Sequence, residues 1–138
     1  MSVIIPVSHT SVLERFSALR SQKRKGFAVL IDPDKTNVEN VQSLVDNAQR
    51  LAISFFFVGG SLLMDDNMRE IIKAIKAISD IPVVLFPGSI QQVVSEADAI
   101  FFLSLISGRN AELLIGSHVL AAPMLKKSKL EVMPTGYI

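Results

Sequence analysis

Short apolar runs rich in valine, isoleucine and phenylalanine alternate along this chain with longer amphipathic segments, and this alternation constrains the fold most strongly. Four runs are clear, at residues 27–31, 53–58, 82–86 and 99–103. Strand-length runs that alternate with helical segments are typical of βαβ units and a parallel sheet. The mean hydropathy of +0.42 fits strands that are buried on both faces, as parallel strands are.

Two helices are predicted in the first third of the chain. The first covers roughly residues 12–21 and precedes the first strand. The second starts at Thr36, where Glu39 completes a capping-box pattern three residues on. Apolar residues then recur at helical spacing along one face, at positions 38, 41, 44, 45, 48 and 51.

The next two connections differ in length. A helix is predicted from about Asp66, with acidic residues in its first turn, where the helix dipole favours them. Only residues 90–96 then separate the third run from the fourth, so two helical turns at most fit there. The third βα unit should therefore be shorter than a standard repeat.

The last part of the chain predicts one more helix and two short strands. Asn110 is a suitable N-cap, and the helix should end near Ala121, before Pro123. Residues 130–133 then suggest a fifth strand, and residues 136–138 suggest a sixth short piece.

Two folds fit this pattern, a doubly wound open sheet and a (β/α)₈ barrel. A barrel typically needs about 250 residues, whereas this chain has 138 and four to five strands. We expect a single α/β domain over residues 1–138 that forms the N-terminal half of a TIM barrel, with the C-terminal half absent. We interpret the chain as a truncated product or a fragment.

Composition excludes several classes of protein. The chain has no cysteine, so disulfides and thiolate metal sites are ruled out. A net charge of +1 argues against a nucleic-acid-binding protein, which normally has a basic face. The first residues lack the features of a secretory signal, and the longest apolar stretch, around residues 99–106, is too short to span a bilayer. We expect a soluble cytoplasmic protein.

Polar or glycine-rich turns follow four of the predicted strands, and in either fold function gathers at the C-terminal ends of parallel strands. Asp32 ends the first run, where an unpaired carboxylate would be costly to bury. Such an oxygen ligand suits Mg²⁺, usually shared with substrate phosphates. An equally good interpretation is that Asp32 and Asp34 only shape the turn or cap a helix.

The remaining polar residues give weaker signals. Gly59, Gly60 and Ser61 would let a phosphate approach the backbone, although an ordinary strand-to-helix turn is the better interpretation of these residues alone. The only histidines are His9 and His118, too few for a histidine metal centre or a hydrolytic triad. We expect His118 to be a packed or surface residue of its helix. The phenylalanine clusters at 55–57 and 101–102 are expected in the core, and a minority could line an apolar channel.

Six motifs occur in order along the chain: IDPDK at 31–35, VGGS at 58–61, LFPGS at 85–89, SGRN at 107–110, LIGSHV at 114–119 and PTGYI at 134–138. Together they resemble the motifs of geranylgeranylglyceryl phosphate synthases and the related heptaprenylglyceryl phosphate synthases. The similarity covers residues 27 to 138. Each motif is loose alone, but six in register are specific.

This resemblance implies a modified TIM barrel that joins a prenyl diphosphate to the hydroxyl of sn-glycerol 1-phosphate. Mg²⁺ would neutralise the leaving diphosphate. Carried over by motif position, Asp32 and Ser61 would be the Mg²⁺ ligands, and Phe101 with its neighbours would bound the prenyl channel. We also expect a homo-oligomer and peripheral contact with a membrane-derived lipid substrate.

The sequence departs from the family at three places. Some members carry a lysine that contacts glycerol phosphate where this chain has Leu30, and the motif after strand four often has Asn-Ser where this chain has Ser107 and Gly108. The family's glycerol-phosphate grip and its catalytic tyrosine and glutamate come from later strands that are not in this sequence. We therefore expect this chain to be inactive by itself.

Two other functions remain open. The first is a non-catalytic half-barrel that self-associates through its open strand edges. The second is another phosphate-handling TIM barrel, such as a sugar-phosphate isomerase. The absence of a catalytic histidine, and of any strand-end lysine apart from Lys35, counts against this second alternative.

Overall fold

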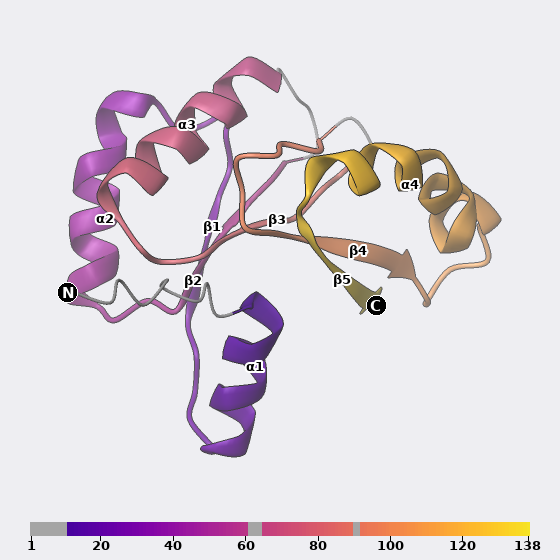
Figure 1. Cartoon of the computed structure of the whole chain (residues 1–138), viewed down its shortest axis with the longest axis horizontal. Helices are drawn as coiled ribbons and strands as arrows, with labels where there is room; N and C mark the ends of the chain where they lie inside the picture. The colour runs from indigo at the N-terminus through magenta and orange to yellow at the C-terminus, as the bar shows by residue number, and fades with distance from the viewer. Residues whose placement is uncertain (1–10, 61–64, 90–91) are drawn as a thin grey trace, which may run out of the picture.

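The chain forms one parallel sheet flanked by helices (Figure 1), in a computed structural model that describes residues 11–60, 65–89 and 92–138. The sheet has five strands in sequence order, and every neighbouring pair is parallel. This arrangement confirms the predicted α/β fold class. The strands are β1 (Ala28–Ile31), β2 (Phe55–Val58), β3 (Val83–Leu85), β4 (Ala99–Leu105) and β5 (Glu131–Tyr137).

Alternate residues of the strands enter two apolar clusters on opposite faces of the sheet. On one face, residues such as Phe56, Val58 and Leu85 pack with α2 (Val41–Arg50) and α3 (Asp65–Ile78). The other face contains a smaller cluster of Val12, Phe55, Val84, Ala99 and Met133. The phenylalanines of residues 55–57 therefore divide between the two faces, which confirms their core role.

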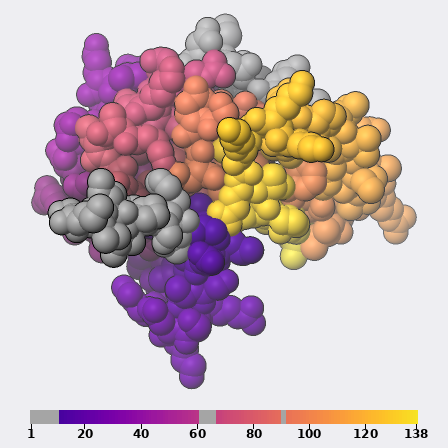
Figure 2. All heavy atoms as spheres, viewed as in Figure 1, coloured from indigo at the N-terminus to yellow at the C-terminus, as the bar shows by residue number. Residues whose placement is uncertain are grey.

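The first helix closes the N-terminal end of the smaller cluster. Helix α1 (Val12–Ser21) has the predicted bounds and projects from the rest of the described chain (Figures 1 and 2). Its Phe16 ring stacks on Phe55, with ring centroids 4.2 Å apart. The carboxylate of Glu131, at the start of β5, accepts hydrogen bonds from the Val12 N–H at 2.6 Å and the Leu13 N–H at 3.0 Å. One acid therefore connects the first helix to the last strand.

Replacing Glu131 with alanine should destabilise the chain by about 1–2 kcal/mol, because two N–H groups at the positive end of α1 lose their acceptor. Urea unfolding monitored by circular dichroism would measure this loss. Glu39→Ala, at an exposed glutamate, is the matched control and should change the free energy of unfolding by less than about 0.5 kcal/mol. Equal effects of the two substitutions would contradict this role for Glu131.

The predicted capping box at Thr36 is wrong. A 3₁₀ turn, η1 (Val38–Asn40), comes first, and α2 begins only at Val41. The Thr36 carbonyl accepts a hydrogen bond from the Asn67 side chain of α3, 3.3 Å away, which holds the backbone here in a loop. Helical geometry therefore starts after Asn37, whose carbonyl accepts from the Asn40 N–H.

The helix after β4 starts as predicted but does not end as predicted. The Asn110 Oδ1 accepts from the Glu112 N–H at 3.0 Å, which confirms Asn110 as the cap. A π-helical segment, η2 (Glu112–Gly116), leads directly into α4 (Ser117–Ser128), which continues through Pro123. The extra turn beyond the proline is stabilised because it buries Leu125. The helix ends before Lys129, which has a positive φ of 61°.

The last two predicted strand pieces are one strand. Residues 131–137 of β5 pair with β4 without interruption, through Pro134. The Glu131 N–H donates to the Asp98 carbonyl, so the backbone N–H and C=O groups of the odd-numbered residues of β5 point towards β4. The backbone groups of Pro134, an even-numbered residue, point away from β4. Because β4 needs no N–H from this position, the proline removes no hydrogen bond from the β4–β5 ladder.

The third βα unit is short, as predicted. Residues 86–89 and 92–98, the described parts of this connection, contain turns and bends but no helix. Separately, none of the helices within the described ranges is long and apolar enough to cross a bilayer.

Candidate functional site at the C-terminal ends of the strands

Asp32 lies directly after β1 in a tight turn. Its Oδ1 accepts a hydrogen bond from the Asp34 N–H at 3.1 Å, and its Oδ2 lies 3.1 Å from the Lys35 Nζ. These contacts with Lys35 and with the Asp34 N–H lower the pKa of the Asp32 carboxyl below its usual range. The carboxylate is therefore ionised at neutral pH, and it shapes its own turn as the alternative interpretation expected.

The turn after β2 lies beside Asp32. Ile31 and Val58 are neighbours in the β1–β2 register, and the Gly59 N–H donates to the Ile31 carbonyl at 3.1 Å. Gly60, the next residue, is the last described before a gap at residues 61–64. Ser61 lies outside the described residues, as does His9, so the pairing of Asp32 with Ser61 as Mg²⁺ ligands stays a prediction.

The turns after β2 and β3 touch so closely that two positions require glycine. A Cβ on Gly59 would overlap the Phe86 carbonyl oxygen and lie 2.7 Å from its carbon. A Cβ on Gly88 would lie 2.6 Å from the Gly60 carbonyl oxygen. The buried Gln92 side chain joins the same turns, since its Oε1 accepts from the Gly88 N–H and its Nε2 donates to the Gly60 carbonyl. These strand ends form one rigid edge.

Asn67 supports the Asp32 turn from the next helix and was not anticipated from the sequence. Its Nδ2 donates to the carbonyls of both Pro33 and Thr36, which lie 34 and 31 residues earlier. The only sequence signal was an asparagine in the first turn of a helix, which is common. The turn is therefore held both from within, by its own N–H groups, and from α3.

Asp32 and Asp34 are the acidic side chains of the turn after β1. Among residues 11–60, 65–89 and 92–138, no three histidine or acidic side chains gather in a way that could hold a metal. The ionised Asp32 carboxylate fits Mg²⁺ that is shared with a diphosphate, because this ion usually keeps one or two protein carboxylates and takes its other ligands from phosphate and water. It does not fit a site built from protein ligands alone.

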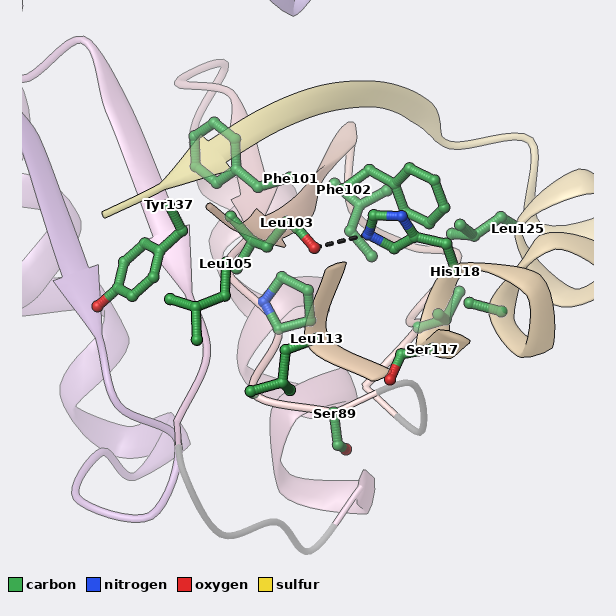
Figure 3. Close-up of a pocket in the computed structure, with 15 residues that line it drawn as sticks. Ser89, Phe101, Phe102, Leu103, Leu105, Leu113, Ser117, His118, Leu125 and Tyr137 are labelled. Atoms are coloured by element: carbon green, nitrogen blue, oxygen red, sulfur yellow. Dashed lines mark hydrogen bonds between the residues drawn. The ribbon is translucent and has the colours of Figure 1, made fainter. Parts of the chain in front are cut away.

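An apolar cavity of about 290 Å³ opens at the C-terminal end of β4 (Figure 3). Its walls come from the turn after β3, from β4, from η2 and α4, and from the end of β5. Phe101, Phe102, Leu103, Leu105, Leu113 and Tyr137 are among its lining residues. The cavity lies beside the part of β4 that extends beyond β3, where the short third βα unit supplies no helix within its described residues.

His118 is packed in its helix, as expected, but it also contacts this cavity. Its ring stacks on Phe102 with centroids 3.9 Å apart, and its Nε2 lies 2.6 Å from the Leu103 carbonyl oxygen (Figure 3). Phe101 and Phe102 also line the cavity. These two phenylalanines are therefore among the minority that we expected to line an apolar space. The side chain of Arg109, from the next turn, is exposed.

Comparison with known proteins gives consistent matches over most of the chain. Residues 19–138 match the model of the PcrB family. A geranylgeranylglyceryl phosphate synthase of Chitinophaga pinensis is 48% identical over 130 residues, which are 94% of this chain and 52% of that protein. A protein of the same name from Pyrococcus furiosus is 39% identical and is matched over 91% of this chain and 51% of its own length.

Solved structures agree with the sequence matches. (S)-3-O-Geranylgeranylglyceryl phosphate synthase of Thermoplasma acidophilum, in complex with its substrate sn-glycerol-1-phosphate, superposes with a TM-score of 0.82 at 35% identity. This match covers 93% of the present chain and 52% of the solved one. The chain therefore spans about half the length of the curated relatives and structures that it matches.

Proposed function

Because the chain belongs to the PcrB family, as its motifs predicted, we propose that it supplies the metal- and prenyl-binding half of a prenyltransferase. The reaction would join a prenyl diphosphate, geranylgeranyl or similar, to sn-glycerol 1-phosphate and give an ether-lipid precursor. The names of the relatives and the glycerol phosphate bound in the Thermoplasma acidophilum structure support this choice of substrates.

The observation that carries the proposal is the ionised Asp32 at the end of β1, beside the glycine turn after β2. Asp32 and Ser61 would hold Mg²⁺, which would supply positive charge to the departing diphosphate. The Lys35 side chain that now pairs with Asp32 is 82% exposed. An ion pair this exposed contributes little, so Asp32 can exchange Lys35 for a metal at small cost.

The apolar cavity supports the prenyl half of the proposal. Its walls are dominated by aliphatic and aromatic side chains, and it begins at Pro87, Gly88 and Ser89, on the same edge of the sheet as Asp32. A diphosphate at the strand ends could therefore extend its hydrocarbon chain past Phe101 into the gap beyond β3. Cytoplasmic location and contact with a lipid surface that delivers the substrate stay predictions.

A chimera tests the reaction as a whole. The half of the Chitinophaga pinensis relative that this chain does not match would be fused after Ile138, and the product would be assayed with geranylgeranyl diphosphate and Mg²⁺. Transfer to sn-glycerol 1-phosphate, with little transfer to sn-glycerol 3-phosphate, is the expected result. A folded chimera that transfers to neither acceptor, beside an active Chitinophaga pinensis control, would contradict the proposal.

One observation favours a second function, self-association without catalysis. Leu30 is 61% exposed on β1, and β1 and β5 are the outer strands of the described sheet. Exposed apolar strands of this kind pair readily with another chain. Sedimentation over a concentration series separates the two proposals, since a monodisperse monomer would exclude the second one. A homo-oligomer is compatible with both.

A further inference from the structure

We propose that His118 is a positioning residue that fixes the free side of β4 and thereby sets the shape of the cavity that receives the prenyl chain. The inference deepens the function proposed above, and it rests on that function for the identity of the ligand. The peptide groups of β4 are shared between its two neighbours, β3 and β5.

The hydrogen bonds to β5 use alternate residues of β4. The Asp98 carbonyl accepts from Glu131, and the Ile106 N–H donates to the Tyr137 carbonyl. The backbone N–H and C=O groups of successive strand residues point to opposite sides of the strand. Those of the even-numbered residues of β4 therefore point towards β5. Leu103 is odd-numbered, and its carbonyl therefore points to the side of β3.

On that side the sheet has a step. The β3–β4 register ends with Leu85 opposite Ile100, whereas β4 continues to Leu105. Strand β3 therefore offers Leu103 no ladder partner. A carbonyl left unpaired at an apolar cavity would be costly, and an alternative donor is required there.

The imidazole of His118 provides this donor from α4. Its Nε2 lies 2.6 Å from the Leu103 oxygen, and because a carbonyl can only accept, Nε2 carries the proton. The ring is also held against Phe102, so both its distance and its tilt are fixed. The His118 side chain thus supplies the hydrogen bond that a neighbouring strand would give to Leu103, while the space beside it remains open as the cavity (Figure 3).

Loss of the His118 hydrogen bond should affect binding of the prenyl chain more than binding of the diphosphate. His118 touches the cavity wall, whereas the Asp32 turn is held by Asn67 and by its own backbone. Without the Nε2–H bond, Leu103 and the rest of the β4 overhang would lose their anchor to α4. The cavity would then fit a prenyl chain less well, while diphosphate and Mg²⁺ would bind as before.

Two variants of the full 138-residue chain separate the hydrogen bond from the packing. His118→Phe keeps an aromatic ring but loses the donor. His118→Gln loses the ring but keeps an N–H at about the same reach. The probes are farnesol, an uncharged prenyl alcohol that needs no metal, and inorganic pyrophosphate with Mg²⁺, both titrated by calorimetry.

We expect His118→Phe to weaken farnesol binding about tenfold, the order of one lost hydrogen bond with its unpaired carbonyl, and His118→Gln to restore most of it. Pyrophosphate binding should change less than about twofold in either variant. The inference is overturned if farnesol binds the phenylalanine variant as well as the wild type or binds neither. It is also overturned if glutamine fails to rescue, or if both probes weaken alike.

The readout is independent of the proposed reaction. If His118→Phe weakens farnesol binding as expected, but the wild-type chain shows no Mg²⁺-dependent binding of prenyl diphosphate, the inference about His118 survives and the proposed function fails. Nitrogen-15 NMR supplies a second check, because a slowly exchanging proton on Nε2 of His118 is required. A neutral ring protonated only on Nδ1 would overturn the inference.

Discussion

Replacing Asp32 with asparagine is expected to weaken Mg²⁺-dependent binding of geranylgeranyl diphosphate to the chain by at least about 100-fold. Loss of a residue that only supports a metal ligand typically costs 10–100-fold, and loss of the ligand itself should cost no less. The amide is nearly the same size as the carboxylate, and the Asp34 N–H can still donate to its oxygen. The effect should therefore reach binding without unfolding the turn.

Calorimetric titration of the prenyl diphosphate, with and without Mg²⁺, measures this loss. Asp34→Asn is the matched control, because it removes a carboxylate two residues away and leaves intact the backbone N–H that Asp32 accepts from. The control should bind within about threefold of the wild type. Binding that is insensitive to Mg²⁺, or equal in the two variants, would remove Asp32 from the proposed metal site.

The lowered pKa of Asp32 also predicts how binding depends on pH. The carboxyl has a pKa below the ordinary value of 3.8, chiefly because of Lys35 and then the Asp34 N–H. The charged form is therefore complete above that ordinary value and is lost only as pH falls through the lower, folded value. Mg²⁺-dependent binding should persist into acid to a lower pH than an ordinary aspartate would allow.

Gly59→Ala is expected to destabilise the chain by about 3 kcal/mol, one of the larger effects open to a single methyl group. The new Cβ would overlap the Phe86 carbonyl group. Neither partner can move easily, because the Gly59 N–H is bonded to Ile31 and the Phe86 N–H to Val58 at 2.9 Å. Relief of the clash would require β2 and β3 to separate at the edge that carries the site.

Thermal unfolding tests this expectation, since about 3 kcal/mol should lower Tm by roughly 10 °C in a chain of this size. Gly108→Ala is the matched control. The nearest atom to its Cβ would be at the end of the Leu105 side chain, 3.3 Å away, and that side chain can shift. A Gly59→Ala chain with the Tm of the control would show that the two turns do not pack as closely as described.

Short sequence patterns predicted the strands and helix ends that depend on residues close together in the chain. The apolar runs located β1 to β4, and a polar residue after a buried run located Asp32 at a strand end. The Asn110 cap was predicted for the same reason, because the cap and its N–H partner are two residues apart. Residue type over such a short span was enough at Asn110 but not at Thr36, where a hydrogen bond from the distant Asn67 holds the backbone in a loop.

The features that sequence patterns missed depend on contacts between distant residues. Glu131 caps a helix 119 residues earlier, and Asn67 holds a loop 34 residues earlier. His118 is required only because β3 stops short of β4, which no property of the histidine reveals. Residues 130–133 and 136–138 were predicted as separate pieces, and their continuity through Pro134 follows only from the register of β5 against β4.

A crystal structure of the chain with Mn²⁺ in place of Mg²⁺ and a non-hydrolysable prenyl diphosphate analogue would test directly whether Asp32 binds the metal. We expect an anomalous peak within about 2.2 Å of an Asp32 carboxylate oxygen, with Ser61 and the diphosphate among the other ligands. A peak bound elsewhere, or a diphosphate bound at the strand ends with no metal beside Asp32, would contradict metal binding by Asp32.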